Sequence, residues 1–138
     1  MIKILHTADL HLDSPFSGVS LATGEELRRG LRRVFSRIVE IARDGDYDAI
    51  FAAGDVFDCG FVSPETVTLV RDAFADFGKP VVIAPGNHDP YLPGSIWAVT
   101  AWSENVHIFK SDSPSFFDLD LGGTPVRVWG WAFMSDRL

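Results

Sequence analysis

Apolar residues in the first 110 positions fall into short runs that are separated by polar segments. Three of these runs, at residues 2–7, 48–53 and 81–84, are only four to six residues long and carry few charges. Runs of this kind are typical of strands that are buried inside a sheet. We therefore expect three buried strands at these positions.

The two segments between these runs show the spacing of amphipathic helices. Thr23 and Glu26 form a capping box, which predicts that the first helix starts at Thr23. Ser63 and Pro64 open the second helix, and Gly78 ends it. The predicted apolar stripe of the first helix consists of Leu27, Leu31, Val34, Ile38 and Ile41.

Strand and helix thus alternate, which predicts an α/β fold built in layers. Gly122 and Gly123 predict a hairpin turn between two later strands. A short helix and three further strands are expected at residues 95–102, 106–109, 115–119 and 126–131. Because no linker or repeat divides the chain, we expect a single domain.

Composition agrees with a globular protein, since 46% of the residues are hydrophobic. The formal net charge of −7 is unusual for a protein that binds nucleic acid. Part of this charge is explained if acidic residues bind cations. The four arginines within residues 28–33 lie mostly off the apolar stripe, so we expect them to form a solvated face.

The chain has no apolar run near the roughly 20 residues that a membrane-spanning helix needs. His6 and Asp9 interrupt the N-terminal apolar stretch too early for a signal peptide. The single cysteine, Cys59, cannot form an internal disulfide, which agrees with a reducing compartment. We therefore expect a cytoplasmic protein.

Each of the three buried strands is followed at once by a polar cluster. In open α/β sheets, ligands bind beyond the carboxyl ends of the strands, so three such loops can converge on one point. That point would hold carboxylates, imidazoles and a carboxamide. The clusters are Asp9-Leu10-His11, Gly54-Asp55-Val56-Phe57-Asp58 and Gly86-Asn87-His88-Asp89.

These side chains suit divalent metals such as Mn²⁺ or Fe²⁺, and no thiolate among them favours a structural zinc site. An extended backbone turns Asp9 and His11 toward the same side. Asp55 has two carboxylate oxygens that could bridge a pair of metals. Such a pair can clamp a phosphate and activate a water. The three clusters, in this order and each just after an apolar strand, therefore predict a metal site.

The order D-x-H, GDxxD and GNH(D/E) resembles that of the calcineurin-like metallophosphoesterases. The segments ILHTADLHLDSPF and AGDVFD are similar to SbcD-type nuclease subunits of DNA double-strand-break repair. This resemblance implies a layered α/β sandwich of the metallophosphoesterase type and two divalent metals. Mn²⁺ is the first candidate, and Fe²⁺ or another metal is the alternative. It implies that Asp9 and His11 hold one metal, that Asp55 bridges both, and that Asn87 holds the second.

The same resemblance assigns chemistry and partners. His88 would act on the leaving oxygen, and Asp58 matches the acid that orients this histidine. The substrate would be the phosphodiester bonds of DNA, hydrolysed as an exonuclease does. The implied protein partners are an SMC-like ATPase subunit and a second copy of the chain, with no membrane involved.

The sequence also departs from the family pattern. Family members complete the site with a later histidine and a GHxH motif, whereas only His107 follows His88 here, and no Gly-His pair occurs. We expect His107 to be structural, because it begins a predicted strand. Residues 1–138 thus match the N-terminal half of the usual domain, and either a fragment or a naturally short protein would have an incomplete second metal position.

Other functions remain open. Phosphoprotein phosphatases of the superfamily have a glycine where Leu12 stands here. They also have an arginine directly after the second aspartate of GDxxD, where this chain has Cys59. The sequence therefore disfavours that activity. A metabolite phosphodiesterase or phosphatase, or a catalytically silent chain, stays as an alternative. Packing rather than base stacking is expected for the four tryptophans, Trp97, Trp102, Trp129 and Trp131.

Overall fold

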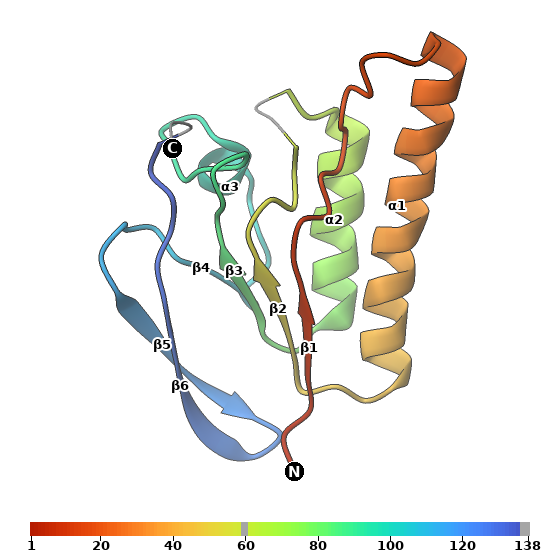
Figure 1. Cartoon of the computed structure of the whole chain (residues 1–138). Coiled ribbons are helices and arrows are strands. Elements are labelled where there is room, and N and C mark those ends of the chain that lie inside the picture. Colours follow the sequence, from red (N-terminus) through yellow and green to blue (C-terminus); the bar gives the residue numbers. More distant parts are fainter. Residues whose placement is uncertain (59–60, 136–138) are drawn as a thin grey trace.

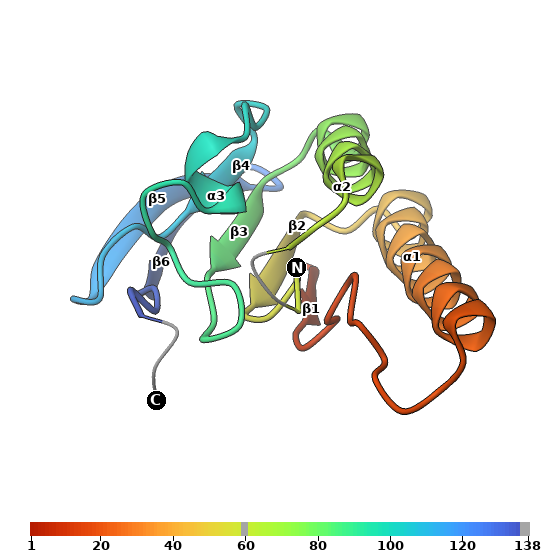
Figure 2. The ribbon, with the colours of Figure 1, turned by 90° about the horizontal axis from the view of Figure 1, so that it is seen from above.

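A computed structural model describes residues 1–58 and 61–135. Its main sheet has four parallel strands in the order β1-β2-β3-β4 (Figure 1). Two long helices, α1 and α2, lie on one face of this sheet, as the view from above shows (Figure 2). The predicted α/β class is confirmed. The strands are β1 (Ile4–Thr7), β2 (Ala49–Ala53), β3 (Val81–Ala84), β4 (Val106–Ile108), β5 (Ser115–Leu121) and β6 (Thr124–Gly130), and the helices are α1 (Leu21–Asp44), α2 (Pro64–Phe77) and α3 (Ile96–Val99).

The main core lies between the sheet and the two long helices. Ile50 and Ile83 are fully buried on the sheet face that these helices cover, and they pack in one cluster with Phe35 of α1 and Phe74 of α2. The rings of Phe35 and Phe74 meet edge to face with their centroids 5.6 Å apart. The apolar strands need burial on both faces, and this core supplies the first of the two.

The opposite face of the sheet is partly covered by the β5–β6 hairpin. Phe117 on β5 packs against Val82 and Phe109 in a second, smaller cluster. Gly122 and Gly123 form the two-residue turn between the strands, with φ values of 61° and 87°. Both residues therefore have the left-handed backbone that such turns require, and the predicted hairpin is confirmed.

Helix α1 begins earlier than predicted. Ser20 is the N-cap residue, since its backbone is extended and its side-chain oxygen accepts a hydrogen bond from the Thr23 amide at 3.2 Å. Thr23 lies inside the first turn, so the prediction that it starts the helix is wrong.

No helix in the described residues has the length and apolar composition that a membrane crossing requires.

The buried face of α1 also differs from the predicted stripe. Leu27, Val34 and Ile41, which were expected to be buried, are all exposed. The helix packs against α2 as well as against the sheet, and this double contact turns its buried face away from them. The buried residues of the helix are Gly24, Phe35, Val39 and Ala42.

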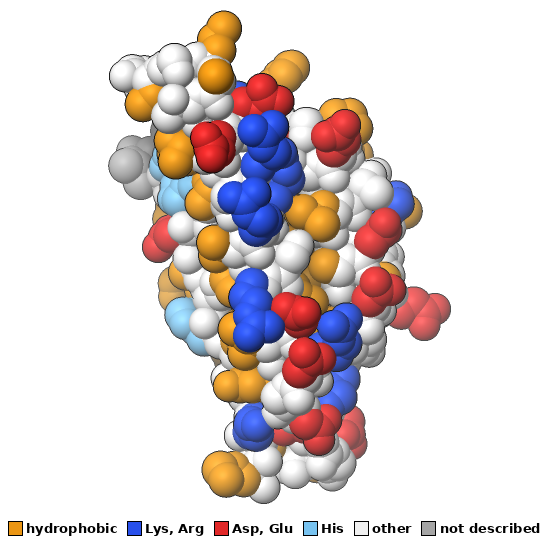
Figure 3. Space-filling model, turned by 90° about the vertical axis from the view of Figure 1, so that its right-hand side faces the viewer, with side chains coloured by type: hydrophobic (Ala, Val, Ile, Leu, Met, Phe, Trp, Pro, Cys, Tyr) orange, Lys and Arg blue, Asp and Glu red, His pale blue; other side chains and the backbone are white. Residues whose placement is uncertain are grey.

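The arginines of residues 28–33 have two kinds of surroundings. Figure 3 shows positive side chains gathered over this side of the molecule. The guanidinium of Arg28 donates to the Pro15 carbonyl at 3.2 Å, and that of Arg32 lies 3.4 Å from the Asp13 carboxylate. These two arginines hold the loop between β1 and α1, so only the other two, which are exposed, form the expected solvated face.

The four tryptophans separate into two pairs. Trp97 in α3 is buried and its ring lies 5.1 Å from that of Trp102, so this pair packs as predicted. Trp129 and Trp131 are 61% and 57% exposed, so neither is a core residue. The Trp129 ring still packs against that of Phe116, 5.0 Å away, and the packing prediction is wrong for Trp131. The predicted helix at 95–102 is confirmed only for Ile96–Val99.

The start of α1 can be tested by comparing two hydroxyl residues. Ser20→Ala removes the side-chain acceptor of the Thr23 amide and should lower the free energy of unfolding by about 1 kcal/mol. Thr23→Ala removes only the hydrogen bond between the two hydroxyls and should change that free energy by less than about 0.5 kcal/mol. Urea unfolding followed by circular dichroism measures both, and a larger loss in Thr23→Ala would contradict the assignment.

Candidate metal centre

Main-chain hydrogen bonds hold the loops after β1 and β2 against each other. The Asp9 amide donates to the Gly54 carbonyl at 3.0 Å, and the His11 amide donates to the Asp55 carbonyl at 2.9 Å. These bonds continue the contact between the two strands past their carboxyl ends. Asp9, His11 and Asp55 all have positive φ values, of 55°, 49° and 54°. Non-glycine residues keep this uncommon left-handed conformation only where the surrounding structure enforces it.

The Asp55 carboxylate lies where the three loops meet. Its Oδ1 accepts a hydrogen bond from the His88 amide at 2.9 Å, and its Oδ2 lies 3.8 Å from His11 Nε2. His11 Nε2 is also 3.8 Å from Asp9 Oδ1. One ligand atom each from His11, Asp55 and His88 lies within 4.8 Å of the other two. Side chains from three separate loops are thus close enough to share a cation.

A hydrogen bond to Asp58 fixes the orientation of His11. The His11 Nδ1 lies 2.7 Å from Asp58 Oδ1. Because a carboxylate oxygen only accepts, Nδ1 carries the hydrogen of this bond, and Nε2 is the ring nitrogen that faces Asp9 and Asp55 and that a metal could bind in the neutral ring. A divalent cation at that point would be bound by nitrogen and oxygen donors, and it would offset the repulsion between the two carboxylates. These residues therefore fit a metal such as Mn²⁺ or Fe²⁺.

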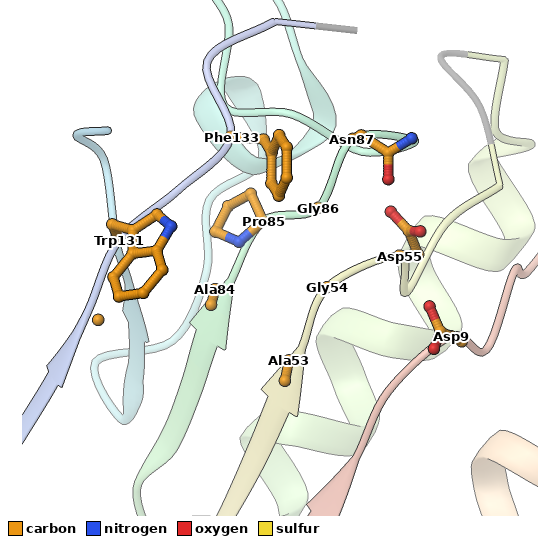
Figure 4. A pocket seen from close by; sticks show the side chains of 11 residues that line it. Asp9, Ala53, Gly54, Asp55, Ala84, Pro85, Gly86, Asn87, Trp131 and Phe133 are labelled. Atoms are coloured by element: carbon orange, nitrogen blue, oxygen red, sulfur yellow. The ribbon is translucent and has the colours of Figure 1, made fainter. Parts of the chain in front are cut away.

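Asp9, Asp55 and Asn87 lie along one side of a cavity of about 350 Å³ (Figure 4). We call this space the site cavity. Its volume falls at the lower end of the range for pockets that hold small molecules. Three of the four predicted metal ligands therefore share one cavity, and the fourth, His11, faces two of them. The other lining residues are Ala53, Gly54, Ala84, Pro85, Gly86, Gly130, Trp131 and Phe133.

The close approach of two loops at this cavity requires glycine. A Cβ added to Gly86 would overlap the carboxylate and the amide nitrogen of Asp55. Gly54 has a φ of 86°, and a Cβ there would lie 3.3 Å from the Gly86 Cα. The two glycines thus permit the loops after β2 and β3 to touch, which places Asp55 beside Asn87.

Asp58 contacts His88 through its main chain rather than its carboxylate. His88 Nδ1 lies 2.9 Å from the Asp58 carbonyl oxygen, whereas the Asp58 carboxylate is 4.0 Å away and is bonded to His11. The geometry therefore differs from the expected one: the carboxylate orients His11, and the carbonyl orients His88. The two imidazole rings meet edge to face with centroids 4.9 Å apart.

Asp89 has a role that was not predicted from the sequence. Its side chain is buried, and its Oδ1 accepts hydrogen bonds from the amides of Asp55 and Gly86 at 3.0 and 2.8 Å. Its Oδ2 accepts from the amides of Val56 and Phe57 at 2.9 and 3.3 Å. Burial raises the pKa of Asp89, and these amide hydrogen bonds act in the opposite direction. One carboxylate thus joins the second polar loop to the third.

His107 lies away from this centre. It is on β4, next to Val82 of β3, and its ring is 5.3 Å from that of Phe117. Burial lowers the pKa of His107 below the ordinary histidine value. These contacts agree with the structural role that was predicted for it.

A parallel α/β sheet with carboxylates, imidazoles and a carboxamide at its carboxyl edge indicates a metal-dependent hydrolase. The family model of the calcineurin-like phosphoesterases matches residues 2–135, and the chain belongs to this family of metal-binding hydrolases. The resemblance inferred from the three motifs is confirmed.

Two curated relatives extend this comparison. The uncharacterized metallophosphoesterase YhaO of Bacillus subtilis is 35% identical over 99% of the chain and 35% of its own length. The DNA double-strand break repair protein Mre11 of Aeropyrum pernix is 33% identical over 93% of the chain and 32% of its own length. The chain therefore spans about a third of the length of the curated relatives that it matches.

The importance of Asp89 can be measured with a conservative change. In Asp89→Asn, an amide nitrogen would replace one carboxylate oxygen. This nitrogen cannot accept hydrogen bonds, so the two backbone N–H groups that face it would lose their acceptor. Two buried donors left without partners should cost about 2–4 kcal/mol of unfolding free energy. Urea unfolding measures this loss. Asp120→Asn is the control, because that exposed carboxylate accepts from a single amide, and an equal loss in both variants would refute the role.

Proposed function

We propose that residues 1–138 form the N-terminal part of a metallophosphoesterase domain that hydrolyses the phosphodiester bonds of DNA with two divalent metals. The observation that carries this proposal is the meeting of His11, Asp55 and His88, from three loops, within 4.8 Å. Similarity to a protein named for double-strand break repair supports DNA as the substrate. A cytoplasmic location remains part of the proposal.

Four side chains would hold the metals, with Mn²⁺ as the first candidate. Asp9 and His11 are assigned to the first metal, Asp55 to both, and Asn87 to the second. The metals, when bound, supply positive charge that stabilises the phosphate and lowers the pKa of a water. Asp58 serves this site indirectly, because its bond to His11 Nδ1 keeps Nε2 of that ring directed at the carboxylates.

His88 is assigned to the leaving oxygen as a proton donor. The Asp58 carbonyl accepts from Nδ1, since a carbonyl oxygen has no hydrogen to give. The free ring nitrogen is therefore Nε2, and the ring can donate a proton from it only while both ring nitrogens carry hydrogen. The side chain is 45% exposed, so a substrate can reach this nitrogen from solvent. Its ring lies against that of His11, which keeps it beside a proposed metal ligand.

The second metal position is the weaker of the two in this chain. Only Asp55 and Asn87 are assigned to it, and the family pattern adds histidines from later motifs that this sequence lacks. Few fixed protein ligands leave water to complete the coordination, which lowers affinity. We infer that a polypeptide of residues 1–138 alone binds one metal well and the second poorly, and that its turnover is correspondingly low.

Partners and alternatives follow from the same proposal. An SMC-like ATPase subunit and a second copy of the chain are the protein partners of the SbcD-type assignment. A metabolite phosphodiesterase is the second candidate function, because a net charge of −7 repels a long polyanion. Comparison of DNA with small phosphodiesters as substrates decides between the two.

The metal site is tested with bis(p-nitrophenyl) phosphate as substrate. The chain should release p-nitrophenolate slowly in Mn²⁺, and EDTA should abolish the reaction. Asp55→Asn should lower the rate by roughly 100-fold or more, since loss of a metal ligand exceeds the loss caused by altering an outer-shell partner. Isothermal titration with Mn²⁺ should show one strong site that Asp9→Asn weakens.

The matched control for both variants is Asp120→Asn, which removes one carboxylate from the hairpin turn far from the three loops. Its rate and its Mn²⁺ affinity should equal those of the wild type. Hydrolysis that persists in EDTA, or an Asp55→Asn protein as active as the wild type, would refute the metal assignment. Hydrolysis of small diesters without any cleavage of single- or double-stranded DNA would favour the metabolite enzyme.

A further inference from the structure

Two aromatic side chains line the site cavity although they are largely open to solvent. Trp131 and Phe133 are 57% and 42% exposed, and they stand across the cavity from Asp9, Asp55 and Asn87 (Figure 4). Within residues 1–58 and 61–135, the Trp131 ring has no ring contact, and its indole N–H has no hydrogen-bond partner. Large exposed apolar groups beside a functional site commonly bind a ligand.

The backbone holds these two side chains in place. Ala132, between them, is buried and its amide donates to the Ser111 carbonyl at 2.8 Å. The Phe133 amide donates to the Pro85 carbonyl at 3.0 Å, and its own carbonyl accepts from the Tyr91 amide at 2.8 Å. Pro85 directly precedes the glycine of the loop that carries Asn87. The aromatic side chains are therefore fastened to the same loop that supplies a proposed metal ligand.

The part of the cavity between the aromatic side and the polar side has almost no side-chain bulk. Ala53 and Ala84 are neighbours in the pairing of β2 with β3, and each is followed within two residues by a glycine of the site. A flat group can therefore lie over the ends of these strands without meeting a long side chain. Charge-binding groups lie on one side of this space, and aromatic surface lies on the other.

We propose that Trp131, together with Phe133, binds the nucleobase of the nucleotide whose phosphate is attacked at the metal centre. This inference rests on the proposed function. A nucleotide joins an anionic phosphate to a flat ring, which matches a cavity that is polar on one side and aromatic on the other. Stacking on an aromatic side chain accepts any base, so it would add affinity without sequence preference. Trp131 is thus a residue that selects nucleotide esters over simple phosphodiesters.

Trp129 provides a matched control on the same strand. It is 61% exposed, but its ring already lies 5.0 Å from that of Phe116, and it does not line the site cavity. If exposure of tryptophan alone created affinity for bases, both residues would bind them. If position beside the metal centre matters, only Trp131 does.

The test compares two substrates that release the same product. Thymidine 5′-(p-nitrophenyl phosphate) has a base on the retained side, and methyl p-nitrophenyl phosphate does not. In Mn²⁺, Trp131→Ala should lower kcat/KM for the thymidine ester about 10- to 100-fold more than for the methyl ester, as expected for the loss of one base stack. Trp131→Phe should recover most of this ratio, and Trp129→Ala should leave it at the wild-type value.

Binding is measured separately from turnover. In Mg²⁺, added thymidine 5′-monophosphate should shift the Trp131 indole N–H signal in a ¹⁵N–¹H spectrum and leave that of Trp129 in place. The same shift is then measured with single-stranded (dT)₁₀. A shift at a lower concentration than the mononucleotide needs would identify DNA as the natural source of the base, and a shift at the same concentration would identify a small nucleotide.

The two proposals fail in different ways. A wild type that hydrolyses neither ester refutes the proposed function, and the indole signals then still decide whether a base binds. An unmoved Trp131 signal, or equal losses on both esters in Trp131→Ala, overturns the inference. The second result would show that the side chain supports the site only structurally.

Discussion

The Asp89 carboxylate is the interaction on which the rest of the centre depends. Its two oxygens accept from four amides that belong to two different loops. One of these amides is that of Asp55, whose own carboxylate accepts from the amide of His88. The chain therefore forms a closed set of hydrogen bonds in which each loop positions the other. Burial raises the pKa of Asp89, and the amide hydrogen bonds act in the opposite direction because they favour its charged form.

This arrangement explains how a short parallel sheet can support acidic side chains crowded at one edge. Asp9, His11 and Asp55 keep positive φ values, which cost conformational energy. The apolar core beneath α1 and α2 and the main-chain bonds between loops offset that cost. The side chains at this edge of the sheet are thus held in place by the protein itself, and the proposed binding of a cation would need little rearrangement of the carboxylates. Prior ordering of this kind increases affinity because little entropy is lost on binding.

Much of this structure follows from the sequence, and the misses have identifiable physical causes. The strands and the meeting of their loops were predictable because hydrophobic runs and chain order alone determine them. Ser20 and Thr23 are both good N-cap residues, and only the observed backbone distinguishes them. The partners of Asp58 and Asp89 depend on distances between loops, which no local pattern encodes. Trp129 and Trp131 look like core residues in a sequence because hydrophobicity does not reveal which faces of a hairpin stay uncovered.

The negative net charge takes on a different meaning once the cavity is considered as a whole. A protein that binds DNA through a wide basic surface needs many positive side chains, and this chain has 12 against 19 acidic ones. Metals at the aspartates would reverse the local sign of charge within a few ångströms, where the phosphate of the proposed substrate would lie. An aromatic surface across the cavity attracts a base by contact, with little dependence on salt. Short-range recognition of this kind is compatible with an acidic protein, since a net charge of −7 acts over distances that physiological salt largely screens.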